Sequence, residues 1–427
     1  MKQITVAIAG LGGRGKDTYA KVAHKYPEEM KITAIADIVP EKVRMVADEY
    51  GVPDEMCFES AEQMLARPKL ADVMFICTMD KQHYAHAMAA LERGYDLLLE
   101  KPISPDLSEC KKIAETANRL GRRVVVCHVL RYTPFYQTLK AKMNAGIIGD
   151  IVAIQAMEQV GYWHQAHSFV RGNWRNAEQT SPMILAKACH DMDILTWLAG
   201  SDCRSLSSIG GLKEFRADRA PEGAADRCVD CVYQESCPYS AVKFYLSKIR
   251  KGETRWPVNI VLENATEQTM LETLKTSPYG RCVYHCDNNV VDHQMVQMNM
   301  KNGVIINFVM SAFTLGGRDL RVLGTKGMIE GNMDNGSLKI HVFDGYGGSK
   351  DEDIDVFALA EDFSGHGGGD NRLVRDLFEI VAGEKTAGSA LTSIDKSVES
   401  HFISLAAEES RLNGGVLIDM EAFAAKF

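Results

Sequence analysis

A glycine-rich turn near the start of the chain constrains the fold more than any other feature. The turn Gly10-Leu11-Gly12-Gly13-Arg14-Gly15 follows the apolar run 4–9 and precedes an amphipathic stretch over 15–26. In the strand-turn-helix unit that this order predicts, Gly10 permits a tight turn, Gly12 lets the backbone approach a pyrophosphate, and Gly15 lets the helix pack closely. The helix N-terminus then attracts the phosphate charge. We therefore expect Gly10, Gly12, Gly13, Arg14 and Gly15 to bind a dinucleotide, with a purely structural turn as the alternative.

An acidic residue, Asp37, ends the next expected strand, over 32–37. A carboxylate at this place accepts hydrogen bonds from the adenosine ribose and repels a 2′-phosphate, which favours NAD over NADP. NADP stays open as the less favoured cofactor because Arg14 could neutralise that phosphate.

Residues 1–130 alternate short apolar runs with stretches of helical period, which is typical of a parallel sheet with crossover helices. The expected strands are 4–9, 32–37, 73–77, 97–100 and 124–128, and the expected helices are 15–26, 40–50, 60–66, 82–93 and 106–120. We predict a doubly wound Rossmann domain over residues 1–130.

After residue 130 the pattern changes to long alternating segments. A helix is expected over 134–145, strands over 151–161, 291–300, 304–312 and 319–323, and closing helices over 371–383 and 393–413. Such alternation predicts an α+β domain over residues 131–427 with a large, mostly antiparallel open sheet, one face of which is solvated or covered by a second subunit. Residues 211–280 contain little strand signal and are interpreted as an insertion.

Composition excludes several classes of partner. The 427 residues carry 48 Lys and Arg against 57 Asp and Glu, for a net charge of −9, and the basic residues are scattered. We expect no nucleic-acid partner and no membrane association, because no apolar run approaches the ~20 residues that cross a bilayer. No export leader precedes the first apolar run, so a cytoplasmic protein is expected.

A cysteine cluster lies inside the insertion. Cys228-x-x-Cys231 followed by Cys237 has a spacing typical of zinc sites, and Cys282 is the first choice of fourth ligand, with Cys286 or Cys203 as alternates. A structural zinc is predicted here because the segment shows little apolar core of its own; an iron–sulfur cluster and a disulfide are the alternatives. Single cysteines at 57, 77, 110, 127 and 189 are expected to be reduced and buried.

Three further motifs carry a family resemblance. They are Glu100-Lys101-Pro102 at the end of a strand, Gly149-Asp150-Ile151 at the entry to the second domain, and His190-Asp191-Met192-Asp193 followed by Leu195-Thr196-Trp197-Leu198. Together with the glycine turn they make the chain resemble the Gfo/Idh/MocA oxidoreductase family over nearly its whole length. The resemblance implies a Rossmann domain, an α/β domain that often forms a dimer or tetramer interface, and redox chemistry on a sugar or cyclitol hydroxyl.

The resemblance also implies roles for particular residues. Glu100 and Lys101 lie in the cofactor and substrate region, with Lys101 held by Pro102, commonly through a cis bond. His83 resembles a position near the nicotinamide, and a structural role at the start of a helix is its alternative. The aspartate that polyol dehydrogenases of the family carry four residues before the histidine corresponds to Ala186 here, so the usual aspartate–histidine relay is not expected. Lys187 is a candidate second cation.

The chemistry of hydride transfer suits the same residues. Removing a hydride from a secondary alcohol needs a base for the hydroxyl proton and donors that stabilise the alkoxide. We assign Lys101 as the donor, His190 as general base or acid, and Asp193 as a group that could orient His190. The alternatives are a solvated lysine and a structural histidine.

A loop between two expected elements carries clustered aromatic and polar groups suited to a polyhydroxylated ring. The expected substrate-binding residues are Tyr162, His164, His167, Arg171, Asn173, Trp174, Asp191, Asp193 and His366. Core roles for the tryptophans and surface roles for the histidines are the alternatives. His366 lies in a second, glycine-rich loop that could close over a ligand.

The sequence thus predicts an NAD(P)-dependent oxidoreductase that transfers a hydride between nicotinamide and a secondary hydroxyl of a sugar, sugar derivative or cyclitol. The partner is a small carbohydrate, and a homodimer or homotetramer through the C-terminal sheet is expected. Two alternatives remain: an NAD-dependent glycoside hydrolase or lyase that works through a transient 3-keto sugar, and a non-catalytic ligand-sensing regulator.

Overall fold

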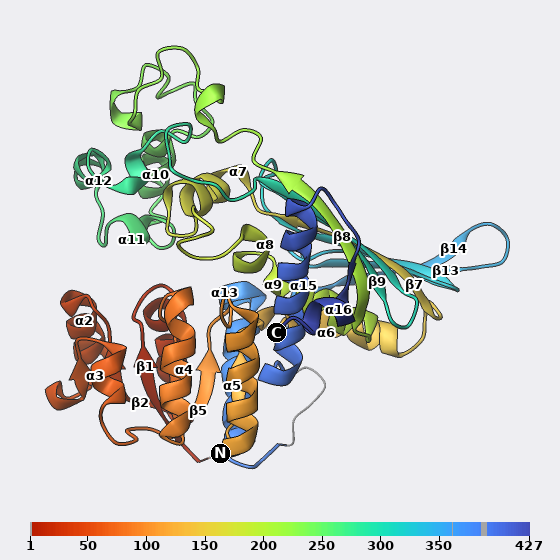
Figure 1. Cartoon of the computed structure of the whole chain (residues 1–427), viewed down its shortest axis with the longest axis horizontal. Helices are drawn as coiled ribbons and strands as arrows, with labels where there is room; N and C mark the ends of the chain where they lie inside the picture. The colour runs from red at the N-terminus through yellow and green to blue at the C-terminus, as the bar shows by residue number, and fades with distance from the viewer. Residues whose placement is uncertain (1, 361, 386–390) are drawn as a thin grey trace.

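The computed structural model describes residues 2–360, 362–385 and 391–427 and contains two sheets (Figure 1). The first sheet has six parallel strands in the order β3-β2-β1-β4-β5-β6. Its strands are β1 (Ile4–Ala9), β2 (Met30–Ala36), β3 (Cys57–Phe58), β4 (Val73–Ile76), β5 (Asp96–Leu99) and β6 (Val124–Val126). The predicted Rossmann topology is confirmed, with the two-residue β3 as an additional strand too short to give a sequence signal.

Helices cover both faces of this sheet because each crossover between parallel strands places a helix on one side. They are a π-helical segment Gly15–Ala20 that continues into α1 (Lys21–Lys25), then α2 (Pro40–Tyr50), α3 (Ala61–Leu65), α4 (His83–Glu92) and α5 (Leu107–Leu120). One further helix, α14 (Gly369–Val381), comes from the far end of the chain. Its Leu373, Leu377 and Phe378 join the apolar cluster that lies against β1, so the core of the parallel sheet includes residues outside 1–130.

The second sheet has nine strands in the order β14-β13-β12-β11-β7-β10-β9-β8-β15. They are β7 (Ile151–Gln159), β8 (Cys203–Gly211), β9 (His293–Met300), β10 (Ile305–Ser311), β11 (Gly317–Gly324), β12 (Gly327–Asn332), β13 (Ser337–Phe343), β14 (Ser349–Asp355) and β15 (Ile418–Asp419). Strands β7 and β10 pair in parallel and the other neighbouring pairs are antiparallel. The predicted mostly antiparallel open sheet is therefore confirmed.

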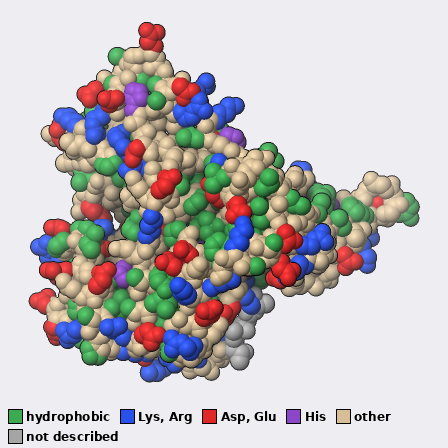
Figure 2. All heavy atoms as spheres, viewed as in Figure 1, with side chains coloured by type: hydrophobic (Ala, Val, Ile, Leu, Met, Phe, Trp, Pro, Cys, Tyr) green, Lys and Arg blue, Asp and Glu red, His purple; other side chains and the backbone are tan. Residues whose placement is uncertain are grey.

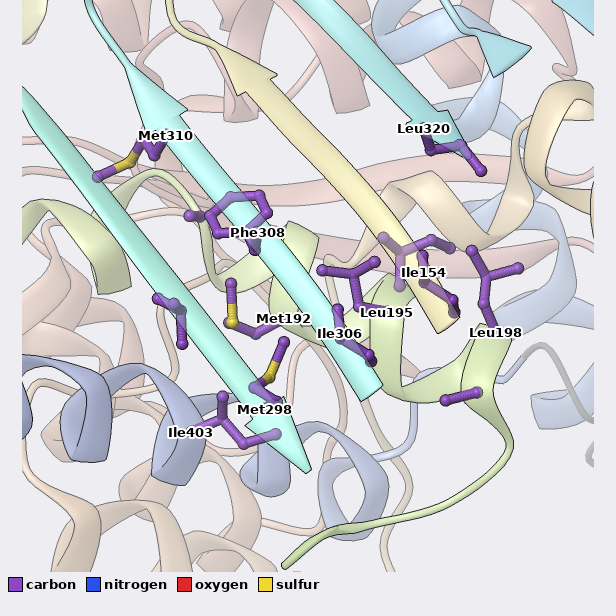
Figure 3. Packing of buried hydrophobic residues seen from close by; sticks show 14 of the residues in the cluster. Ile154, Met192, Leu195, Leu198, Met298, Ile306, Phe308, Met310, Leu320 and Ile403 are labelled. Carbon is purple, nitrogen blue, oxygen red and sulfur yellow. The ribbon is translucent and has the colours of Figure 1, made fainter. Parts of the chain in front are cut away.

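Helices α9 (Cys189–Ala199) and α15 (Ile394–Leu412) cover one face of this sheet, with α6 (Pro134–Asn144), α8 (Met183–Ala186) and α16 (Met420–Ala424) beside them. Alternate residues of β10, namely Ile306, Phe308 and Met310, belong to the same apolar cluster as Met192 and Leu195 of α9 (Figure 3). The period-two pattern thus separates a buried face from an open one, and α9 brings His190 to the domain boundary.

The insertion is helical, as its lack of strand signal predicts. It contains α10 (Ala241–Arg250), α11 (Val258–Val261) and α12 (Glu267–Leu274). It has a small apolar core, to which the cysteine segment 227–240 contributes Cys228, built from Cys228, Ala241, Val242, Tyr245, Leu246, Val258, Ala265, Met270 and Leu274. Among the described residues, no helix combines the length and apolar character that crossing a membrane requires.

Candidate active site

The glycine turn has the geometry that its spacing predicts. Gly10 has a φ of +90°, and a Cβ there would lie 2.4 Å from the carbonyl oxygen of Cys77. A Cβ on Gly15 would lie 1.9 Å from the carbonyl oxygen of Gly10, whereas one on Gly12 would meet no described atom within 4 Å. Gly10 and Gly15 are therefore required by packing, and the open space at Gly12 is where a bulky group can approach the backbone, as a pyrophosphate does.

Asp37 lies beside this turn at the end of β2. One carboxylate oxygen accepts a hydrogen bond from the amide of Leu11 at 2.6 Å, and the other accepts from the amide of Val39 at 2.9 Å. The side chain is half-buried. A fixed carboxylate next to the phosphate-binding turn suits the ribose hydroxyls of NAD.

Arg14 differs from its predicted role. Its guanidinium donates to Glu100 at 2.6 Å and to Asp370 at 2.6 Å, and also contacts the Tyr19 hydroxyl and the His366 ring. Burial lowers its pKa, but the two carboxylates outweigh burial and hold the pKa well above the ordinary value. Arg14 is thus committed to an ion network and is not free to neutralise a 2′-phosphate beside Asp37.

This network links distant parts of the chain. Glu100 ends β5 and also accepts from the Tyr19 hydroxyl at 2.7 Å, while Asp370 belongs to α14. Burial raises the pKa of Asp370, yet Arg14 and His366 more than offset burial and keep that carboxyl ionised. Sequence reasoning missed Asp370 as a functional residue, although its place at the start of a helix after a glycine loop was visible.

Lys101 lies at the carboxyl end of β5, where parallel sheets bind ligands. The Lys101-Pro102 peptide is cis. The lysine ammonium donates to the carbonyl oxygen of Ala186 at 2.8 Å, and its amide donates to Glu100 at 3.0 Å. The residue that replaces the family's aspartate therefore contributes a backbone oxygen that holds Lys101.

The contacts of His83 favour its structural alternative. The ring nitrogens face the carbonyl oxygens of Pro102 at 2.7 Å and Thr78 at 3.0 Å, and the side chain is 1% exposed. The imidazole is thus engaged with the main chain and braces the Lys101-Pro102 turn instead of reaching the cofactor.

His190 lies on α9 and is buried. Its Nδ1 has no hydrogen-bond partner within the part of the chain that the structure describes. The ring centroid lies 5.7 Å from that of His128 and 5.9 Å from that of His366. Burial and the nearby Lys101 hold the pKa of His190 well below its ordinary value. A neutral imidazole with an unsatisfied nitrogen is suited to accept a proton from a bound hydroxyl.

Asp193 does not orient His190 or face a ligand, which corrects both predictions for it. Its two carboxylate oxygens accept from the Arg131 guanidinium, each at 2.7 Å, and the side chain is 1% exposed. Asp193 forms a buried bidentate pair and has a structural role.

Lys187 lies within a second ion network. Its ammonium is 3.0 Å from Glu158, which also pairs with Arg318 at 2.6 Å, and Arg318 in turn pairs with Asp191 at 2.8 Å. Burial raises the pKa of Glu158, but Arg318 and Lys187 outweigh it and leave that pKa below the ordinary value. Asp191 is therefore held by Arg318, which corrects its assignment as a free substrate ligand.

Glu158 and Arg318 were missed by sequence reasoning. Glu158 occupies an inward-facing position of β7, on the same face as buried Ile154. A charged residue at an otherwise apolar position of an alternating strand was the available signal.

Two residues of the aromatic loop have structural partners instead of facing a ligand. The His167 Nδ1 lies 2.6 Å from the Tyr245 hydroxyl, and burial lowers its pKa to about 3. Arg171 donates to the backbone oxygens of Arg281 at 2.6 Å and Tyr239 at 2.7 Å. Both side chains anchor the insertion to the second domain, and these contacts do not support their assignment as substrate ligands.

The remaining loop residues differ among themselves. Trp174 donates its indole N–H to Asp80 at 3.2 Å, which favours the core-anchor alternative. His164 lies close enough to Lys187 and Lys101 that, after burial, these cations lower its pKa, so it borders the site. Tyr162 is half-buried and Asn173 is exposed.

The His366 ring, 3.1 Å from Asp370, is half-exposed above His190 and stays a candidate ligand.

The cysteine cluster does not form the predicted metal site. Cys228, Cys231, Cys237 and Cys282 line one small cavity together with Arg171. Within residues 2–360, 362–385 and 391–427, however, no three His, Cys, Asp or Glu side chains are arranged to hold a metal ion. Zinc is therefore not supported. All eleven cysteines are free thiols.

The fold and the glycine turn define a class: an oxidoreductase with a Rossmann domain followed by a second domain built on a large, mostly antiparallel sheet. Residues 4–128 match the model "Oxidoreductase family, NAD-binding Rossmann fold", and residues 140–400 match "Oxidoreductase family, C-terminal alpha/beta domain". The chain belongs to the Gfo/Idh/MocA oxidoreductase family and is an NAD-dependent dehydrogenase of that type.

Individual relatives are distant. The YteT protein of Bacillus subtilis is 22% identical over 87% of this chain and 88% of its own length. The inositol 2-dehydrogenase/D-chiro-inositol 3-dehydrogenase of Lactiplantibacillus plantarum is 30% identical over 47% of this chain and 54% of its own length. The chain thus matches about half the length of that inositol dehydrogenase.

Solved structures share the fold. An oxidoreductase domain protein from Kribbella flavida superposes with a TM-score of 0.71 at 16% identity and covers 98% of this chain and 100% of its own. An inositol dehydrogenase homologue from Azotobacter vinelandii, complexed with NADH and myo-inositol, gives a TM-score of 0.66 at 16% identity, covering 98% of each chain.

Proposed function

We propose that this enzyme oxidises a secondary hydroxyl of a cyclitol or a sugar, with NAD as the hydride acceptor. The observation that carries the proposal is the unpartnered Nδ1 of buried His190 in a region that also contains the Lys101 ammonium. A buried polar atom without a protein partner calls for one from the substrate.

Each residue has a role in this reaction. His190 accepts the hydroxyl proton through its neutral imidazole, and Lys101, held by the carbonyl of Ala186, donates to the same oxygen as negative charge develops on it. Arg318, which pairs with Glu158 and Asp191, is one of the cations that oppose protonation of the imidazole. NAD, when bound, supplies the carbon that takes the hydride.

The relatives support a cyclitol or a similar polyol as the substrate. Several of them are named inositol 2-dehydrogenases, and one solved relative holds NADH and myo-inositol. The half-exposed His366 and the bordering His164 add donors and acceptors suited to further hydroxyls.

A substrate panel tests the proposal. Purified enzyme is mixed with NAD and with free cyclitols, free sugars and glycosides, and both reduced nicotinamide and released aglycone are measured. The proposal expects NADH from at least one free polyol. Aglycone release without NADH would instead support the redox-neutral glycosidase, and saturable polyol binding without turnover would support the regulator.

We propose NAD as the preferred cofactor over NADP. Asp37 is fixed beside the glycine turn, and the one nearby guanidinium considered from sequence, that of Arg14, is committed to Glu100 and Asp370. NADP should therefore bind at least tenfold more weakly than NAD in a titration, and equal affinities would contradict this preference.

We also propose that the open face of the nine-stranded sheet forms a subunit interface. Register places Ile209, Met295, Val309 and Met157 side by side across β8, β9, β10 and β7. Ile209 is 61% exposed and Met295 41% exposed, and an apolar row of this kind is typical of an interface. Met295→Glu should turn a dimer or tetramer into monomers by light scattering; a wild-type monomer would contradict the proposal.

The eleven free thiols fit a reducing compartment, so we propose a cytoplasmic location. Cell fractionation tests this.

A further inference from the structure

The insertion reaches across the domain boundary to the glycine turn. Figure 1 shows α11 on the side of the insertion that faces the Rossmann domain, and Figure 2 shows the molecular surface hollowed between these two lobes. The chain from Trp256 to Glu263 contains α11 and its two flanks. We call residues 256–263 the bridging segment.

Two hydrogen bonds join the bridging segment to the start of the phosphate-binding helix, and Ile260 lies beside the glycine turn. Asn259 donates its side-chain amide to Asp17 at 3.0 Å, and the Lys16 ammonium donates to Glu263 at 2.6 Å. A Cβ built on Gly13 would lie 3.8 Å from the Cδ1 atom of Ile260. The segment therefore contacts the glycine turn and the first turn of the helix after it, which together would hold a pyrophosphate.

The other end of the bridging segment contacts the substrate side. The Trp256 ring lies 5.1 Å from the ring of His164 and 5.4 Å from that of Trp163, measured between centroids. His164 belongs to the aromatic loop for which a substrate-binding role is predicted. One short segment thus touches both the dinucleotide turn and the border of the substrate site.

The bridging segment also has a firm anchor on the insertion. Val258 is fully buried in the apolar core that α10 and α12 share. Ile260, by contrast, is 39% exposed, and the Oδ1 atom of Asn259 is buried without a hydrogen-bond partner among the described residues. The apolar side chain of Ile260 is therefore partly open beside the glycine turn, while buried Val258 fixes the backbone that carries it.

We propose that the bridging segment is a cover for the bound dinucleotide: it closes over the pyrophosphate at Gly12 and Gly13 and slows the release of NAD. Asn259 and Glu263 hold the cover to Asp17 and Lys16, and Ile260 shields the turn from solvent. The inference concerns retention of the cofactor, goes beyond the proposed reaction and does not depend on the substrate.

The rate of cofactor release tests this proposal. Wild-type enzyme and the variant Asn259→Ala/Glu263→Gln are loaded with NADH, mixed with excess NAD, and the loss of bound-nicotinamide fluorescence is followed by stopped flow. The variant should release NADH about five- to tenfold faster, while its association rate stays within twofold of wild type.

A matched control separates the cover from a general effect on the insertion. Glu272→Gln, on α12 of the same insertion, removes an ion pair with Lys275 that lies away from the glycine turn, and it should release NADH at the wild-type rate. Ile260→Ser provides a second test and should also speed release.

The outcomes are distinguishable. If the double variant and Ile260→Ser both release NADH at the wild-type rate while circular dichroism shows them folded, the cover is wrong but the proposed reaction stands. If Glu272→Gln speeds release as much as they do, the effect belongs to the insertion as a whole and the cover is again wrong. A folded wild-type chain that binds no NADH would overturn the cover and the cofactor assignment together.

Discussion

The dinucleotide end and the substrate end of this molecule are built in different ways. At the glycine turn, six consecutive residues determine the geometry through backbone packing, and Gly10, Gly12 and Gly15 each have the environment that their spacing predicts. At the substrate end, side chains from β5, β7, α9 and the loop before α14 meet. The local sequence therefore specifies the geometry of the glycine turn. At the substrate end, only the fold reveals which side chains are not already paired with other protein groups.

The largest effect should come from the substrate end. His190→Asn removes the proposed base and should lower kcat by about 10²- to 10⁴-fold while NAD affinity changes little. In the wild type, the low pKa of His190 should place the acid limb of kcat/KM below pH 6.5, the ordinary value for histidine. Stopped-flow kinetics measure the fall in kcat, and a pH profile of the wild type measures the position of the acid limb.

Asp193→Asn is the control for that substitution, because Asp193 pairs with Arg131 and not with His190. It should lower thermal stability and leave the acid limb where it is. If Asp193→Asn shifted the limb while His190→Asn did not, the assignment of the base would be wrong.

Buried histidines predict a loss of stability in acid. Burial lowers the pKa values of His128 and His190 below the ordinary range and those of His167 and His401 to about 3. Above about pH 7.5 these rings are neutral in both states and do not affect stability. As pH falls below about 6.5, only the unfolded state binds the protons, so unfolding becomes more favourable by about 1 kcal/mol per histidine for one pH unit.

Thermal unfolding between pH 8 and pH 5.5 measures this effect. His401→Leu, which removes one of the four rings, should flatten the decline at low pH. A midpoint that does not change across this range would contradict the burial of neutral imidazoles.

Two glycine substitutions test which glycine of the dinucleotide turn is required for packing and which for NAD binding. Gly15→Ala places a Cβ against the Gly10 carbonyl and should destabilise the chain by about 3 kcal/mol. Gly12→Ala meets open space, so its midpoint should stay near the wild-type value while NAD affinity falls tenfold or more. Scanning calorimetry measures the loss of stability and an NAD titration measures the loss of affinity. Equal effects of both substitutions on stability would contradict the assignment of Gly15 to packing and of Gly12 to NAD binding.

The smallest effect is expected at His167, which the sequence assigned to the substrate. His167→Phe removes the contact with the Tyr245 hydroxyl and should cost about 1 kcal/mol of stability. Because His167 anchors the insertion, KM for the polyol should stay within threefold of wild type. A tenfold rise in KM without a loss of stability would restore His167 to the substrate site.

The sequence predicted the two sheets, the insertion and the glycine turn because each rests on a local period or spacing. It did not predict that Arg14 would pair with Asp370, or Asp193 with Arg131, since both pairs join segments far apart in the chain. It assigned too many residues of the aromatic loop to substrate binding, because residue type alone does not say whether His167 or Arg171 faces a ligand or a neighbouring helix. Strands β8, β12, β13, β14 and β15 of the second sheet were not predicted. In β14, nearly all side chains are exposed and most are polar or charged, so it shows no alternating pattern.

The most direct test of the central claim is a calorimetric titration of the folded wild-type chain with NAD. The account predicts one NAD bound per chain, with affinity reduced at least tenfold by Gly12→Ala. A well-folded chain that gives no binding heat at several temperatures would contradict it.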